Sequence, residues 1–183
     1  EKINKLKKNF LNEKIDGYIV SKNDEFFGEY IPLHKDRLKY ISDFTGSYGF
    51  ALILKNKNYL FVDGRYTLQA NNESGKHFEI KTIPNQLPSD ILKNKILKIG
   101  FDPKLFTKRN FQILFSKTKC KYIPLRENLV DQFWKKRGSL NSKKFYKLPD
   151  SSVGEKYESK IRKIISKVKK SNADYQFITA SEN

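Results

Sequence analysis

The first 135 residues alternate between two hydrophobic patterns. Apolar residues three or four positions apart are typical of amphipathic helices, whereas short and nearly continuous apolar runs are typical of buried strands. The helical pattern covers residues 1–10, 35–42, 65–72, 89–93, 108–117 and 128–135. The strand pattern covers residues 18–20, 50–55, 59–63, 77–83, 97–101 and 121–123.

Two of these strand patterns, 50–55 and 59–63, are separated only by Asn56-Lys57-Asn58, which predicts a hairpin. Elsewhere the strands alternate with helices, and this order implies a sheet that carries helices on both faces. The hairpin makes the sheet mixed instead of purely parallel. We therefore expect an α/β fold of three layers, with a mixed sheet between two layers of helices.

The last part of the chain follows a different plan. Residues 136–151 show no sustained period, which indicates a linker. An apolar stripe at helical spacing then predicts a helix over 153–171, with Ser152 and Glu155 spaced as a capping box.

Residues 175–180 continue the tail with a strand pattern. One helix and one strand cannot bury the apolar stripe of residues 153–171 by themselves, so we expect the tail to begin a second domain. The expected division is a first domain over 1–137, a linker over 138–151 and the start of a truncated second domain over 152–183.

Composition narrows the class of protein. Hydrophobic residues make up 38% and aromatic residues 14%, which predicts a globular chain. The single cysteine, Cys120, excludes an internal disulfide and a cysteine-built metal site, and no apolar run is long enough to span a bilayer. The N-terminus lacks the apolar centre of a signal peptide, so the expected location is the cytoplasm.

The net charge of +17 raises the possibility of a nucleic-acid-binding protein. Only six of the 37 basic residues are arginine, however, and the lysines are scattered from end to end. Nucleic-acid-binding grooves are typically rich in arginine, whose guanidinium donates two hydrogen bonds at once. Scattered lysines therefore predict a solvated charged surface instead of a nucleic-acid-binding site. A stand-alone basic interaction or nucleic-acid-binding module remains the alternative.

Several short motifs carry a resemblance that composition does not. They are Glu29-Tyr30-Ile31, Arg37, Ser42, Phe44, Gly46-Ser47, Gly49, Asp63-Gly64-Arg65-Tyr66, Leu68-Gln69-Ala70, Ile99 to Pro103, Glu127-Asn128-Leu129-Val130-Asp131, Trp134, Arg137 and Phe177 to Ala180. With these motifs the chain resembles the N-terminal domain of aminopeptidase P, the Xaa-Pro aminopeptidase family related to creatinase and prolidase. Thr45 departs from the pattern, because relatives often have an acidic residue there.

This resemblance implies a metal-dependent hydrolase of the larger, three-domain type. Its catalytic domain would hold two divalent metals, usually manganese, on two Asp, one His and two Glu, and would release the first residue of peptides with proline second. This chain would be the non-catalytic N-terminal fragment, which covers and shapes the substrate site. Its partners would be its own second and catalytic domains and, for the parent, short proline-containing peptides, with no membrane.

The segment Asp63–Tyr66 allows two interpretations, which do not exclude each other. In the structural one, Asp63 caps the following helix, Gly64 permits the turn, and Arg65 pairs with a carboxylate such as Glu29 or Asp43. In the functional one, Arg65 points toward the catalytic domain and anchors a substrate carbonyl or carboxylate. Tyr66 or Tyr30 would then form a wall of the substrate pocket.

Other motif residues are expected to have structural roles. Arg37 is interpreted as an ion pair on a helix surface, and Ser47 belongs to a tight turn after Gly46, because no base lies near it in the sequence. Asn128 and Asp131, together with Glu127, are expected to cap and orient a helix.

The remaining candidates have apolar or metal-binding side chains. Trp134 is expected to be a core residue or an anchor between domains, and Cys120 to be a buried residue that begins an inner strand. His34 and His77 are the only histidines, and neither has a partner at ligand spacing. No metal site is therefore expected in this chain.

Overall fold

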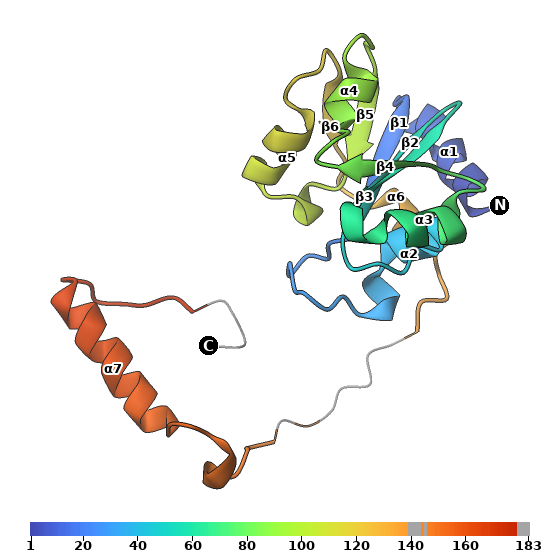
Figure 1. Ribbon diagram of the computed structural model, residues 1–183. Coiled ribbons are helices and arrows are strands. Elements are labelled where there is room, and N and C mark those ends of the chain that lie inside the picture. The colour runs from blue at the N-terminus through green and yellow to red at the C-terminus, as the bar shows by residue number, and fades with distance from the viewer. Residues whose placement is uncertain (139–143, 145, 179–183) are drawn as a thin grey trace. The chain divides into compact units, whose positions relative to one another are not determined.

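The computed structural model describes residues 1–138, 144 and 146–178. The chain divides into two compact units, Glu1–Leu140 and Asn141–Asn183, and each is described here by itself. Figure 1 shows the first unit as a sheet between helices and the second as a helix with short flanking segments.

The first unit is built on one six-stranded sheet. Its strands lie in the order β4-β3-β2-β1-β5-β6. Their bounds are β1 Gly17–Ser21, β2 Gly49–Leu54, β3 Asn58–Asp63, β4 Glu79–Ile83, β5 Lys98–Phe101 and β6 Lys121–Pro124. Strand β2 runs antiparallel to both of its neighbours, and the other adjacent pairs are parallel. Five strands therefore end at the edge where β2 begins, which we call the carboxyl edge.

Helices cover both faces of this sheet, as the two sides of the sheet in Figure 1 show. One face packs against α1 Lys2–Asn12, α2 Arg37–Ser42, α3 Thr67–Ser74 and α6 Leu129–Phe133. The other face packs against α4 Pro88–Leu92 and α5 Lys108–Phe115. The expected three-layer α/β fold with a mixed sheet is confirmed.

The hairpin of β2 and β3 explains why its sequence reads as two continuous apolar runs. Along β2, Phe50 and Leu52 point to the side of α4 and α5, while Ala51 and Ile53 point to the opposite side. All four side chains are buried. Because both faces of a central strand are covered, every position is apolar and no polar alternation remains.

Element ends differ from the sequence prediction by a few residues. The predicted helix 65–72 begins as a 3-10 turn, Gly64–Tyr66, and continues as α3. The predicted strand start at His77 is wrong by two residues, because β4 begins at Glu79. Cys120 precedes β6, which is an edge strand and not an inner one, and its thiol is only partly buried and donates to the Lys95 carbonyl at 3.3 Å.

The second unit corrects two further predictions. Helix α7, Tyr157–Lys170, begins four residues later than predicted, and Lys156 is its N-cap. The expected capping box does not form, because Ser152 belongs to a separate 3-10 turn, Asp150–Ser152. Glu155 instead accepts a hydrogen bond from the Ser159 hydroxyl and pairs with Lys163 at 2.7 Å.

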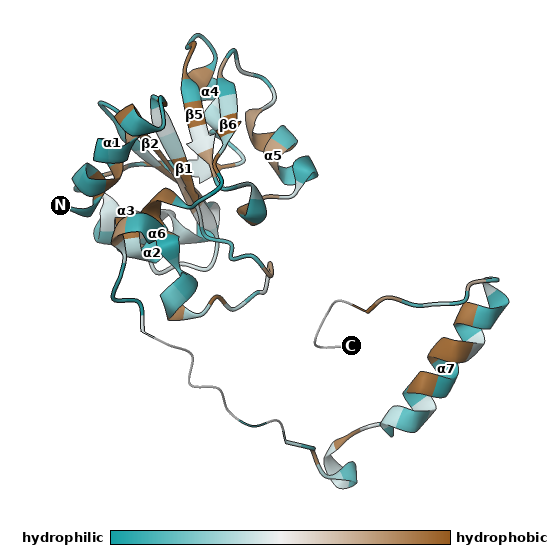
Figure 2. Ribbon diagram, turned by 180° about the vertical axis from the view of Figure 1, so that it is seen from behind, coloured by the Kyte–Doolittle hydropathy of each residue, from teal (hydrophilic) through white to brown (hydrophobic). Residues whose placement is uncertain are grey.

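The predicted strand of the tail is also wrong within the described residues. Residues 175–178 form no strand, since an isolated strand has no ladder partner to satisfy its backbone groups, and residues 179–180 lie outside the described part. The apolar stripe of α7, brown in Figure 2, stays largely exposed: Ile161 retains 49% of its accessible surface and Ile165 47%.

Candidate functional site

The carboxyl edge collects the polar residues that follow the strands. Lys22 follows β1, Asp63 ends β3, and Asp102 follows β5. The turn Gly46-Ser47 precedes β2 and therefore lies at the same edge. In open α/β sheets such an edge is where ligands bind.

Asp63 and Arg65 form a small self-contained pair at the end of β3. The Asp63 carboxylate accepts hydrogen bonds from the Arg65 backbone N–H at 2.9 Å and from Arg65 Nε at 3.0 Å. The hydrogen bond and charge of Arg65 lower the pKa of Asp63. The expected pairing of Arg65 with Glu29 or Asp43 is wrong, because the neighbouring Asp63 is within reach and Asp43 pairs with Lys2 at 2.8 Å.

The side chain of Arg65 is largely exposed, so its guanidinium is accessible to a ligand. Its side chain retains 73% of its accessible surface and lies 5.4 Å from the Tyr66 ring. Tyr66 Oη shares a hydrogen bond of 2.8 Å with Ser47 Oγ, and its ring meets Phe44 edge-on at 6.0 Å. Arg65, Tyr66 and Ser47 therefore form one exposed polar group, which we call the β3-end cluster.

In the turn before β2, position 46 must be glycine for a steric reason. A Cβ at Gly46 would lie 2.2 Å from the tip of the Phe44 ring, which is fully buried. Next to it, Thr45 donates to Glu73 from its backbone N–H at 2.8 Å and from its hydroxyl at 2.6 Å. The residue that departs from the family pattern thus ties this turn to α3.

Tyr30 lies elsewhere at the edge. It belongs to the long loop between β1 and α2, and its side chain is 87% exposed. Within the described residues, no hydrogen bond, ion pair or aromatic contact links Tyr30 to Arg65 or Tyr66. The structure brings two of the three substrate-pocket candidates together and leaves Tyr30 outside that group.

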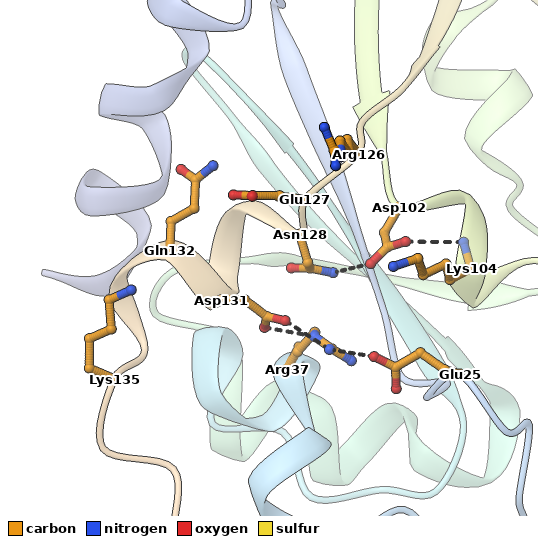
Figure 3. A pocket seen from close by; sticks show the side chains of 10 residues that line it. All are labelled: Glu25, Arg37, Asp102, Lys104, Arg126, Glu127, Asn128, Asp131, Gln132 and Lys135. Atoms are coloured by element: carbon orange, nitrogen blue, oxygen red, sulfur yellow. Dashed lines mark hydrogen bonds and ion pairs between the residues drawn. The ribbon is translucent and has the colours of Figure 1, made fainter.

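A pocket of about 340 Å³ opens at the other half of the carboxyl edge, beside β5 and β6 (Figure 3). Four acidic and four basic side chains line it together with two amides. These residues are Glu25, Arg37, Asp102, Lys104, Arg126, Glu127, Asn128, Asp131, Gln132 and Lys135.

Arg37 is the central cation of this pocket. Its Nε and Nη2 donate to the two oxygens of Asp131 at 2.8 and 2.9 Å, and Nη2 also donates to Glu25 at 2.8 Å. The expected ion pair of Arg37 is confirmed, but its expected place on the helix surface is wrong, because only 4% of the side chain is exposed. Glu25 lies in the loop before α2, 12 residues from Arg37, whereas Asp131 lies on α6, 94 residues away.

The network also fixes the protonation state of Glu25. Burial by itself would raise the pKa of this carboxyl, but hydrogen bonds from Lys35 and Arg37 lower it to about 2. Burial opposes the charge of Arg37 as well, yet Asp131 and Glu25 raise its pKa above the usual value. Glu25 and Arg37 therefore stay ionised throughout the physiological range.

Asn128 joins the pocket to the core. Its Oδ1 accepts from the Val130 backbone N–H at 3.0 Å and caps α6, while its Nδ2 donates to Asp102 at 3.0 Å. The next backbone N–H, of Leu129, donates to Tyr18 Oη at 3.3 Å. Asn128 thus ties the start of α6 to the end of β5, and Leu129 ties it to Tyr18 of β1.

The α6 end places Trp134 and Arg137. Trp134 stacks on Tyr40 with ring centroids 4.4 Å apart, and Arg137 lies 5.3 Å from the Trp134 ring. Arg137 also pairs with Asp131 at 3.0 Å. Asp131, Trp134 and Arg137 therefore form one connected group, whereas the sequence predicts separate caps and anchors.

The described residues contain no group of three or more His, Cys, Asp or Glu that could hold a metal. His34 lies in a 3-10 turn and His77 precedes β4, so the two imidazoles do not belong to the polar clusters of the carboxyl edge. Among the described helices, none is both long and apolar enough to cross a membrane.

The sequence of residues 2–132 matches the family model of the Creatinase/Prolidase N-terminal domain. The match covers well over half of the chain, and the chain therefore belongs to this family. The fold and the motif set at the carboxyl edge agree with the resemblance stated from the sequence.

Relatives within the family are more specific. The chain is 30% identical over 202 residues to Xaa-Pro aminopeptidase 1 of Dictyostelium discoideum, which covers 98% of this chain and 31% of that protein. A probable Xaa-Pro aminopeptidase P of Coprinopsis cinerea is also 30% identical, over 86% of this chain and 27% of that protein.

A solved structure is similar in fold over nearly the same span. The X-prolyl aminopeptidase of Caenorhabditis elegans, described as a cytosolic enzyme with a di-nuclear active site, aligns with a TM-score of 0.78 and 25% identity. The alignment covers 94% of this chain and 31% of that one. The chain thus spans about a quarter to a third of the length of the relatives it matches.

Proposed function

We propose that this chain is the non-catalytic N-terminal part of a cytoplasmic Xaa-Pro aminopeptidase, which releases the first residue from peptides with proline second. The observation that carries the proposal is the 30% identity to the Dictyostelium enzyme across 98% of the chain. The division into a first domain over 1–137, a linker over 138–151 and the start of a second domain over 152–183 belongs to the same proposal.

The two divalent metals, manganese in this proposal, are held by another part of the polypeptide. They would generate the hydroxide nucleophile and polarise the substrate carbonyl. The described residues offer no cluster that fits them. In this proposal the chain contributes no step of the bond cleavage. Its contribution is to cover the substrate site and to limit access to short peptides.

Within this function, the β3-end cluster is the proposed substrate-facing group. Arg65 is exposed, held at its root by Asp63, and free to donate to a peptide carbonyl or carboxylate. Tyr66 supplies an aromatic wall that Ser47 and Phe44 hold in place. Tyr30 would reach the same substrate only from the β1–α2 loop.

The test of the proposed activity compares the full-length gene product with the 183-residue chain. With manganese, the full-length protein should cleave peptides that have proline second, and the 183-residue chain should cleave none and retain no manganese. Cleavage by the short chain would overturn the proposal. A full-length product without such activity would favour the stand-alone basic interaction module.

Replacing Arg65 by lysine in the full-length enzyme should raise KM or lower kcat several-fold for short Xaa-Pro peptides. Lysine keeps the charge but loses the planar pair of donors that a carbonyl or carboxylate accepts. Steady-state kinetics with a tripeptide that has proline second would measure the effect.

The matched control for this kinetic prediction is Arg109→Lys. Arg109 is exposed on α5, which covers the opposite face of the sheet, and its replacement should leave both constants unchanged. If Arg65→Lys behaves like Arg109→Lys, the Asp63–Arg65 pair serves the turn alone.

A further inference from the structure

The loop between β1 and α2, residues 22–36, exposes an unusual amount of apolar surface. Phe26 is 78% exposed, Tyr30 87%, Leu33 72% and Phe27 43%. In Figure 1 this loop is the blue segment that runs from β1 to α2 and extends away from the sheet. Four large apolar side chains gathered within eight residues of one loop are typical of a surface that another molecule or domain covers.

Buried charges hold this loop at its base. Lys22 pairs with Asp36 at 2.7 Å, and both side chains are less than a tenth exposed. Glu25 pairs with Lys35 at 2.9 Å and with Arg37 at 2.8 Å, so the two arms of the loop are bridged twice. The exposed apolar residues are therefore presented by a fixed frame, which lowers the entropy cost of binding a partner.

The same frame reaches the point where the chain leaves the sheet domain. Arg37 joins Glu25 of the loop to Asp131 of α6, and Asp131 in turn pairs with Arg137 beyond the helix. Arg137 also donates to the Trp134 carbonyl at 2.8 Å. The position of the apolar loop and the position of residue 137 are thus set by one continuous series of ion pairs.

We propose that the exposed face of Phe26, Phe27, Tyr30 and Leu33 is a docking surface for the catalytic part of the same polypeptide. This inference rests on the proposed function. Two observations favour that occupant: the chain spans only 31% of relatives that it matches over 94–98% of its own length, and the ion pairs connect the loop to the segment that leads onward.

The partner surface is expected to be apolar, because the loop supplies an aromatic centre. Lys35, whose ammonium lies 4.5 Å from the Phe26 ring, is already paired with Glu25. Docking would hold the carboxyl edge, with the β3-end cluster, against the catalytic part. Arg65 would then approach the substrate without any contact of its own to the catalytic domain.

Hydrogen–deuterium exchange of residues 24–35 tests the docking surface. In the full-length gene product these amides should exchange at least about tenfold more slowly than in the 183-residue chain, because a covered loop opens only when the interface opens. The double variant Phe26→Ser/Tyr30→Ser in the full-length protein should restore the fast exchange of the short chain. Both side chains are mostly exposed, so the fold of the first unit should not change.

Ile96→Ser is the matched control for that experiment. Ile96 is 84% exposed and precedes β5, at the edge opposite to the loop, and its replacement should leave the protection intact. Equal exchange of the loop in the full-length and short chains would overturn the proposal. Protection that appears in the short chain as its concentration rises would overturn it in favour of a second copy of this chain.

Peptidase activity is measured on the same full-length sample and separates the two proposals. If the full-length protein cleaves Xaa-Pro peptides but the loop is not protected, the docking proposal is wrong and the proposed function stands. If the loop is protected but no Xaa-Pro peptide is cleaved, the docking proposal stands and the proposed function is wrong.

Discussion

Replacing Lys22 by methionine is expected to lower the free energy of unfolding of the first unit by about 3–5 kcal/mol. Lys22 and Asp36 are 8% and 6% exposed, and their charged atoms lie 2.7 Å apart. Without the ammonium group, the Asp36 carboxylate would remain buried with only the Lys39 backbone N–H as a described donor. Urea denaturation followed by the fluorescence of Trp134, the only tryptophan, measures the change.

The double variant Lys22→Met/Asp36→Asn separates the unpaired charge from lost packing. Asparagine keeps an acceptor for the Lys39 N–H and removes the charge, so most of the stability should return. Lys55→Met is the control, because the Lys55–Asp16 pair is 61% and 31% exposed and should contribute only about 0–1 kcal/mol. If Lys22→Met costs no more than Lys55→Met, water reaches the Lys22–Asp36 pair.

Replacing Phe61 by alanine should cost about 3–5 kcal/mol, because the change opens a cavity between the sheet and α5. Phe61 is fully buried and stacks on Phe50 with centroids 4.9 Å apart. Phe50 in turn meets Phe115 of α5 at 5.9 Å, so the cavity cannot close without moving two further rings. The same urea denaturation experiment measures this loss of unfolding free energy.

Phe26→Ala removes the same number of atoms from an exposed phenylalanine and should change the unfolding free energy by no more than about 0.5 kcal/mol. A similar loss in both variants would mean that the ring of Phe61 contributes nothing beyond its local propensity. The comparison therefore isolates the packing between the sheet and α5.

The layers of the fold could be predicted because burial leaves a direct mark on the sequence. The runs of β2 and β3 are apolar at every central position, since both faces are covered, and the helices show one apolar side. Element ends were less accurate, because local hydrogen bonds decide them. Asp63 starts a 3-10 turn before α3, and Ser152 starts no helix at all.

The charged pocket could not be found by the same reasoning. Arg37 and Asp131 are 94 residues apart, and no local pattern tells which carboxylate will cover a given guanidinium. Both residues appeared in the family motifs, and so did Asn128, but each was assigned a local role. The β3-end cluster was easier, because Asp63, Arg65 and Tyr66 are neighbours in sequence.

Because β2 runs opposite to the other five strands, the two ends of the sheet carry different kinds of connection. Around the carboxyl edge lie the long β1–α2 loop, the turn before β2 and the polar ends of β3, β5 and β6, whereas the opposite end holds the short hairpin turn between β2 and β3. Amino-acid changes at the first end can therefore retune what the molecule recognises while the scaffold persists. Changes at the second end would mainly alter how firmly the sheet holds together.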